Sequence, residues 1–129
     1  MPNKGLNQIK LYGTTDSGGD LTVTSTNITL GCLVAVEWID GDLADGVDAV
    51  LSVVRDNNAP DVTLLTLTNS NTDAWYYPQT PVQDNAGADV TFDGTNEIYT
   101  QQVVNGKLKL VISSGGNAKS GGAIVYVSA

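Results

Sequence analysis

The sequence contains no histidine and only one cysteine and one methionine. Histidine is the side chain that most often acts as a general base or metal ligand near neutral pH. An enzyme built on this chain would have to work with carboxylates alone. The single cysteine, Cys32, leaves no partner for an internal disulfide. We therefore expect no enzymatic activity, no cofactor, and neither a metal nor a disulfide that folding requires.

Basic residues are also scarce. Five lysines and Arg55 stand against fourteen acidic residues, which gives a net charge of −8. Such a surface repels phosphate backbones. The nearest approach to a basic patch is Lys107 and Lys109, which supply only two charges on one strand face. The sequence has no apolar run of membrane-spanning length, and its first residues lack the apolar segment of a secretory signal. We expect neither a nucleic acid nor a membrane as partner, and synthesis and folding in a reducing cytoplasm.

The chain instead carries apolar residues with a period of two along most of its 129 residues, a length typical of one domain. Residues 1–18 hold the short apolar pair Ile9 and Leu11 before a loop, which predicts an N-terminal arm or edge strand. Residues 19–129 predict an all-β domain. We expect a single antiparallel β-sandwich, jelly-roll or Ig-like, of about eight short strands.

The expected strands are separated by glycine, asparagine and aspartate. They cover residues 21–26, 33–39, 49–55, 62–68, 73–78, 99–104, 107–112 and 123–128. The second of these is apolar on both faces except for Glu37, which predicts a central strand with Trp38 in the core. The alternating run Ile28, Leu30, Cys32 predicts that Cys32 is a small buried hydrophobic residue.

Turn chemistry is clearest at Asn105-Gly106. This dipeptide accepts the two positive φ values of a type I′ turn and predicts a hairpin between residues 99–104 and 107–112. The polar stretch 79–97 and the glycine-rich stretch 113–122 predict long, mobile or functional loops. Only residues 43–51 are compatible with a helical turn.

Four closely spaced aspartates invite comparison with a calcium loop: Asp40, Asp42, Asp45 and Asp48. The register is wrong, because the third ligand position holds Ala44 and the closing glutamate position holds Leu51. This pattern favours a solvated turn. A carboxylate-based hydrolase remains conceivable in composition, but no spacing identifies a catalytic pair.

Consecutive aromatic residues mark the best candidate for a binding surface. Alternation along a strand places Trp75 and Tyr77 on one face and Tyr76 on the other. One interpretation makes two of them core residues and uses the third to cover an edge. The other makes them an exposed platform, as in a carbohydrate-binding or adhesin module.

Several segments together resemble small virion structural proteins of tailed bacteriophages. They are residues 35–47, 73–78, 93–96 and 104–121, within a resemblance that spans about residues 33–127. The resemblance implies a β-sandwich protein that coats or cements the exterior of the capsid as a dimer or trimer. A neck or tail position in the virion is the alternative.

Under this resemblance the partners are the major capsid protein and further copies of the chain. Before Asp16 the only charged residues are Lys4 and Lys10, so the N-terminal segment is locally positive and suited to carboxylates on a shell. The predicted contact residues are these two lysines, the aromatic residues Trp75, Tyr76 and Tyr77, and Lys119 in the glycine-rich loop.

Overall fold

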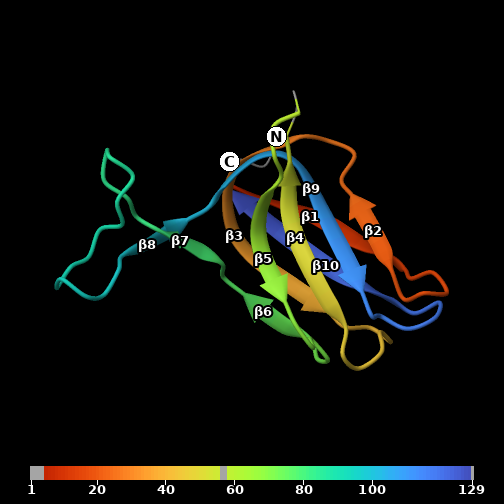
Figure 1. The fold of residues 1–129 in the computed structure, drawn as a ribbon. Helices are drawn as coiled ribbons and strands as arrows, with labels where there is room; N and C mark the ends of the chain where they lie inside the picture. The colour runs from red at the N-terminus through yellow and green to blue at the C-terminus, as the bar shows by residue number, and fades with distance from the viewer. Residues whose placement is uncertain (1–4, 56–57, 129) are drawn as a thin grey trace.

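A computed structural model describes residues 5–55 and 58–128 and shows an all-β chain, with no helix in that part (Figure 1). All strand pairs are antiparallel. The strands are β1 (Leu6–Thr14), β2 (Leu21–Thr24), β3 (Thr29–Ile39), β4 (Asp48–Val54), β5 (Val62–Leu67), β6 (Ala74–Tyr76), β7 (Gln79–Pro81), β8 (Tyr99–Gln101), β9 (Val103–Ser113) and β10 (Ser120–Ser128).

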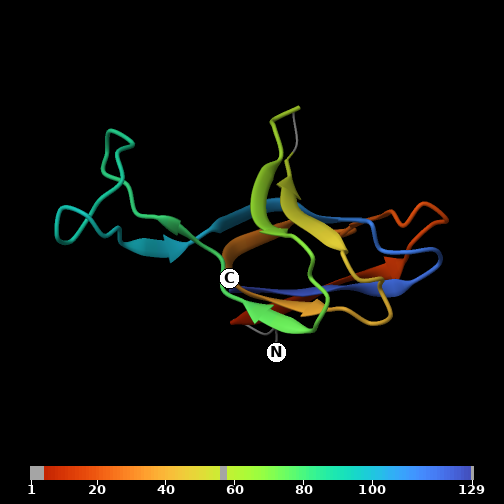
Figure 2. The ribbon, with the colours of Figure 1, turned by 60° about the horizontal axis from the view of Figure 1, so that its bottom comes forward.

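Eight of these strands form two layers around one core. One layer has the order β1-β10-β3-β6, and the other has the order β2-β9-β4-β5. The layers are joined where the start of β9 pairs with the start of β3. Figure 2 shows the two layers edge-on, with the short β7–β8 pair standing outside them. The predicted antiparallel sandwich is confirmed.

The core is formed by the inward side chains of both layers. Trp38 is fully buried, and its indole Nε1–H donates to the Ser70 carbonyl oxygen over 3.0 Å. From the opposite layer, Leu108, Leu110 and Ile112 point inward, as their alternation predicts. Burial of large apolar side chains is the main stabilising contribution, on the order of 2 kcal/mol for each one.

A β-bulge in β3 overturns the expected burial of Cys32. The β10 partners step from Tyr126↔Ala35 directly to Val127↔Leu33, so Val34 is the extra residue. The bulge reverses the alternation: Val36 and Trp38 face the core on one side of it, whereas Leu33 does so on the other. Cys32 is consequently only half-buried, and Ile28 and Leu30 are exposed.

The predicted hairpin at Asn105-Gly106 is wrong, because β9 continues through both residues. Residues 103–106 pair with β3, and residues 107–113 pair with β4. A Cβ atom on Gly106 would lie 2.3 Å from the Val54 carbonyl oxygen. The glycine therefore allows two backbones to approach closely. Tight turns also require glycine, so the residue alone does not separate the two structures.

Two further expectations change. Residues 43–51 contain no helical turn; the chain there passes from turns into β4. The glycine-rich loop 113–122 is tied down, since the Thr15 hydroxyl donates to the Gly116 carbonyl over 2.6 Å and Gly115 N–H donates to the Gly19 carbonyl over 2.9 Å. The N-terminal segment forms edge strand β1, paired with β10 along nine residues.

Candidate functional site

The outer faces of the two layers differ in chemistry. In the β1-β10-β3-β6 layer, a cross-strand row runs Lys10–Ile124–Glu37–Trp75. Beside it lie Tyr12 and Tyr126. We call these six residues the aromatic face. The outer face of the other layer instead bears exposed threonines, namely Thr22, Thr24, Thr63 and Thr66, together with Lys107 and Lys109 of β9.

Contacts within the aromatic face hold its side chains in place. The rings of Trp75 and Tyr126 stack with centroids 5.3 Å apart, and the Lys10 ammonium lies 5.0 Å from the centre of the Tyr12 ring. The Tyr126 hydroxyl donates to Glu37 Oε1 over 3.2 Å. Partial desolvation and this carboxylate raise the pKa of Tyr126, so the phenol remains a neutral donor. Trp75 is half exposed despite the stacking.

The structure decides between the two interpretations of the aromatic segment. Tyr76 packs against the core, whereas Trp75 and Tyr77 are exposed. One of the three residues is therefore partly buried against the core, and none is a fully buried core residue. Lys10 joins Trp75 on one face through the register of β1, β10, β3 and β6, which no local pattern in the sequence specifies.

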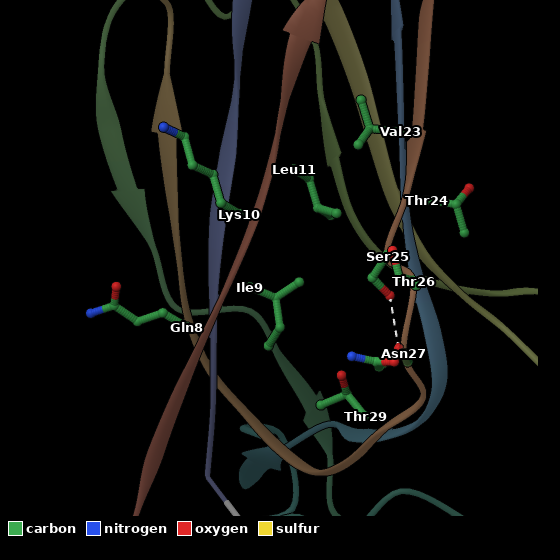
Figure 3. A pocket seen from close by; sticks show the side chains of 10 residues that line it. All are labelled: Gln8, Ile9, Lys10, Leu11, Val23, Thr24, Ser25, Thr26, Asn27 and Thr29. Atoms are coloured by element: carbon green, nitrogen blue, oxygen red, sulfur yellow. Dashed lines mark hydrogen bonds between the residues drawn. The ribbon is translucent and has the colours of Figure 1, made fainter. Parts of the chain in front are cut away.

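A groove lies between β1 and β2, where the two layers are not hydrogen-bonded to each other. Ile9, Leu11 and Val23 line it, and Gln8 and Lys10 project to the opposite side of β1 (Figure 3). The rest of the lining is mainly hydroxyl groups, and the Ser25 hydroxyl already donates to the Asn27 carbonyl. No titratable group points into this groove in Figure 3.

The most unusual element is a β-ribbon, residues 79–101, that projects from the body (Figures 1 and 2). It begins with β7 and ends with β8. Between them the chain forms two tight loops, residues 84–88 and 92–96, closed by the bridges Gln83↔Asp89 and Thr91↔Glu97. The ribbon thus has a defined shape although it packs little against the sandwich.

Two aspartates fix the loops of the ribbon. Asp84 Oδ1 accepts the N–H groups of Ala86 and Ala88 at 2.9 and 3.0 Å, and Asp93 Oδ1 accepts those of Thr95 and Asn96 at 2.9 and 2.6 Å. These backbone donors lower the pKa of both carboxyl groups, most strongly through Ala88 and Asn96. The ribbon therefore stays anionic under mildly acidic conditions.

The ribbon and its root expose large apolar side chains. Phe92 is 69 % exposed, and Tyr99 and Ile98 are also exposed. Residues 77–106 contain four acidic residues and no lysine or arginine. The sequence predicts a loop over residues 79–97 and a strand from Tyr99, and neither Phe92 nor Tyr99 is among the predicted contact residues. The apolar character of Phe92 within a polar stretch is the signal that could have identified it.

A second exposed apolar surface surrounds the start of β9. Leu30 and Val103 are 67 % and 65 % exposed, and Val62 and Arg55 line the same shallow hollow as Val103. Lys107 lies farther along the side of β9 that carries Val103. We call these five residues the β9 patch.

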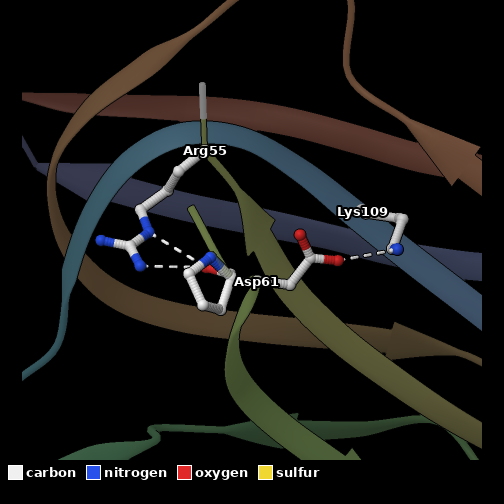
Figure 4. Close-up of polar contacts among 4 residues, drawn as sticks. Arg55, Asp61 and Lys109 are labelled. Atoms are coloured by element: carbon white, nitrogen blue, oxygen red, sulfur yellow. Dashed lines mark hydrogen bonds and ion pairs between the residues drawn. The ribbon is translucent and has the colours of Figure 1, made fainter. Parts of the chain in front are cut away.

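Cations give the β9 patch its charge. Arg55 Nε and Nη2 donate to the Pro60 carbonyl, and Lys109 Nζ pairs with Asp61 Oδ2 at 2.9 Å (Figure 4). Among the described residues of this region, Arg55, Lys107 and Lys109 stand against the single carboxylate of Asp61. The patch is thus locally positive on an acidic protein.

The aspartates of the 40–48 turn serve as ties between loops. Asp42 Oδ1 accepts the Ser120 N–H, and Asp73 Oδ1 accepts the Asp40 N–H over 2.8 Å. Desolvation, followed by the neighbouring carboxylates of Asp73, Asp45 and Asp42, raises the pKa of Asp40. No group of potential metal ligands occurs in residues 5–55 and 58–128.

The remaining predicted contact residues are not brought together. Lys119 is exposed in the loop before β10, whereas Lys4 lies outside the described residues.

No protein-family model matches the chain, and no curated protein matches it either. None of the described elements is a helix long and apolar enough to cross a bilayer.

Proposed function

We propose that this chain is a non-enzymatic structural protein of a tailed-phage virion that binds the outer surface of the capsid and stabilises it. The observation that carries the proposal is the difference between the two outer faces. One presents stacked aromatic rings beside a single cation, and the other presents threonines, Lys107 and Lys109 together with the exposed apolar start of β9. The aromatic face is an ordered exposed surface of the kind that contacts a larger partner. That the larger partner is a capsid is inferred from the resemblance of the sequence to phage virion proteins.

The chemistry of the aromatic face supports a protein surface as its target. Tyrosine and tryptophan combine a large apolar area with a polar group, which is why they are enriched at protein interfaces. Lys10 adds one positive charge that is suited to a carboxylate on the shell. A face of this size gives a weak contact, and an oligomer bound at several points holds far more firmly through effective concentration.

The test is co-sedimentation of the purified protein with undecorated capsids. We expect the full chain to pellet with capsids, and Trp75→Ala and Lys10→Glu each to weaken binding at least about tenfold, as loss of an interface anchor does. Thr66→Ala, on the opposite face, is the matched control and should bind like the parent. Binding should also weaken as salt screens Lys10.

Three outcomes bear on the proposal. Failure of the full chain to sediment at every salt concentration refutes it. Binding that tolerates both Trp75→Ala and Lys10→Glu moves the contact away from the aromatic face. Binding to isolated necks or tails instead of heads assigns the protein to that part of the virion.

A second candidate function is carbohydrate binding by the same face. It is favoured by one observation: the half-exposed Trp75 is supported from below by the Tyr126 ring, and Glu37 supplies a hydrogen-bond acceptor beside it. A glycan array probed with the parent and with Trp75→Ala separates the two functions. Glycan binding that is lost in the variant, without capsid binding, supports this candidate.

A further inference from the structure

We propose that the β-ribbon of one copy docks on the β9 patch of a second copy of this chain. This contact adds a partner surface to the proposed capsid binding without using the aromatic face. Capsid binding and self-association can therefore fail independently of each other. The ribbon has a defined shape, and the chemistry of the two surfaces is complementary.

The ribbon does not bury its own apolar side chains. A two-stranded ribbon is marginally stable in water without a surface to pack against. Phe92 and Tyr99 are nevertheless mostly exposed. The turns accepted by Asp84 and Asp93 hold the backbone in one shape, so docking would order few additional groups. A preformed apolar projection of this kind is suited to insertion into a neighbour.

The ribbon and the β9 patch also differ in the sign of their net charge. The ribbon carries Asp84, Asp89, Asp93 and Glu97 with no cation. The β9 patch places Arg55 and Lys107 around Leu30, Val62 and Val103. The ribbon thus combines exposed apolar area with negative charge alone. Around the patch Arg55, Lys107 and Lys109 outnumber Asp61 and the Asp56 that follows Arg55 in the sequence, so its net charge has the opposite sign. In a protein of net charge −8, a locally positive apolar surface is a specific match for an acidic ribbon.

The direction of the ribbon keeps its tip away from the patch of its own copy. The ribbon leaves the body beside the patch, since Thr80 at its root lines the same hollow as Arg55 and Val103. It then runs away from the sandwich in both views (Figures 1 and 2), so its tip cannot fold back onto its own patch without rebuilding the root. A second copy offers the same patch to the tip of the ribbon. A closed oligomer, in which every ribbon is docked, satisfies all copies at once.

Sedimentation equilibrium of the purified chain without capsids tests the contact. We expect the parent to form a closed oligomer that weakens with added salt. Glu97→Lys on the ribbon and Lys107→Glu on the patch should each weaken association at least about tenfold, because each places like charges together. Asp20→Lys makes the same charge change as Glu97→Lys, but in the exposed loop before β2, and should associate like the parent.

A charge swap separates a specific contact from damage to the fold. When Glu97→Lys and Lys107→Glu are mixed, the lysine introduced at position 97 of one variant faces the glutamate introduced at position 107 of the other, and association should return. The double variant should also associate with itself. Phe92→Ser tests the apolar part and should weaken association without changing the melting temperature of the body.

The result that overturns the proposal is a parent chain that stays monomeric at all concentrations up to about 1 mM. Association that is indifferent to both Glu97→Lys and Lys107→Glu overturns it equally. If each variant is folded and dissociated but the mixture fails to associate, the ribbon and the patch do not contact each other, and the pairing proposed here is wrong.

Discussion

Substitutions at Asn105 and Gly106 distinguish a continuous β9 from a hairpin turn. In the structure, both residues lie within a strand that pairs with β3. Asn105 is exposed, so Asn105→Val should change the free energy of unfolding by less than about 0.5 kcal/mol. Valine is well suited to a strand. In a type I′ turn the same change would force a β-branched residue to positive φ and cost about 1–2 kcal/mol.

Gly106→Ala should behave oppositely. The new methyl group would lie 2.3 Å from the Val54 carbonyl oxygen and 3.0 Å from Val53 Cγ1. Neither atom belongs to a flexible chain end, so β4 and β9 must separate. Overpacking of this kind costs about 1–3 kcal/mol.

For a chain of this length, that cost corresponds to a fall in melting temperature of roughly 4–12 °C. Gly5→Ala, where nothing lies within 4 Å of the added carbon, is the control. Thermal unfolding followed by circular dichroism measures all three variants. A strongly destabilised Asn105→Val together with a parent-like Gly106→Ala would refute the continuous strand.

Two further predictions concern carboxylates. Because burial and neighbouring charges raise the folded-state pKa of Asp40, its carboxylate opposes folding above the unfolded value of 3.8. Asp40→Asn should therefore raise the melting temperature at pH 7, with the gain vanishing as the pH falls through 3.8; an equal gain at all pH values would contradict this cause. In the ribbon, Asp84→Ala and Asp93→Ala remove the loop acceptors. Limited proteolysis should then cleave residues 84–97 faster while the melting temperature of the body is unchanged. If the melting temperature falls together with the resistance to proteolysis, the ribbon unfolds cooperatively with the body and this prediction is wrong.

Most of the fold follows from the period-two pattern. Trp38 and the inward residues of β9 are where alternation places them, because a side chain in a strand has only two faces to choose from. The errors occur where backbone geometry intervenes. The bulge at Val34 reverses the alternation and turns Leu30 and Cys32 outward. Sequence spacing contains no mark of such an extra residue.

Gly106 illustrates a different ambiguity. A glycine after an asparagine satisfies a turn that needs positive φ, and it also satisfies a strand that another backbone approaches closely. Local sequence cannot separate the two, since the deciding atom, the Val54 carbonyl oxygen, lies more than fifty residues away in the chain. The site residues show the same limit: Lys10 and Trp75 share a face through pairings among four strands.

The continuity of β9 also bears on how the ribbon could work. This strand begins two residues after β8, passes through the patch residues Val103 and Lys107, and then pairs with β4 to the end of the sandwich. The root of the ribbon is joined to this strand through Gln102, whose carbonyl accepts the Leu33 N–H over 2.8 Å and whose side chain donates to the Leu64 carbonyl over 2.9 Å. A hairpin at Asn105-Gly106 would instead have placed a turn inside the patch, between Val103 and Lys107. With Gln102 held to the body and β9 continuous, the ribbon leaves next to the same patch surface in every copy, which is the condition for identical subunits to meet at identical angles and close into an oligomer.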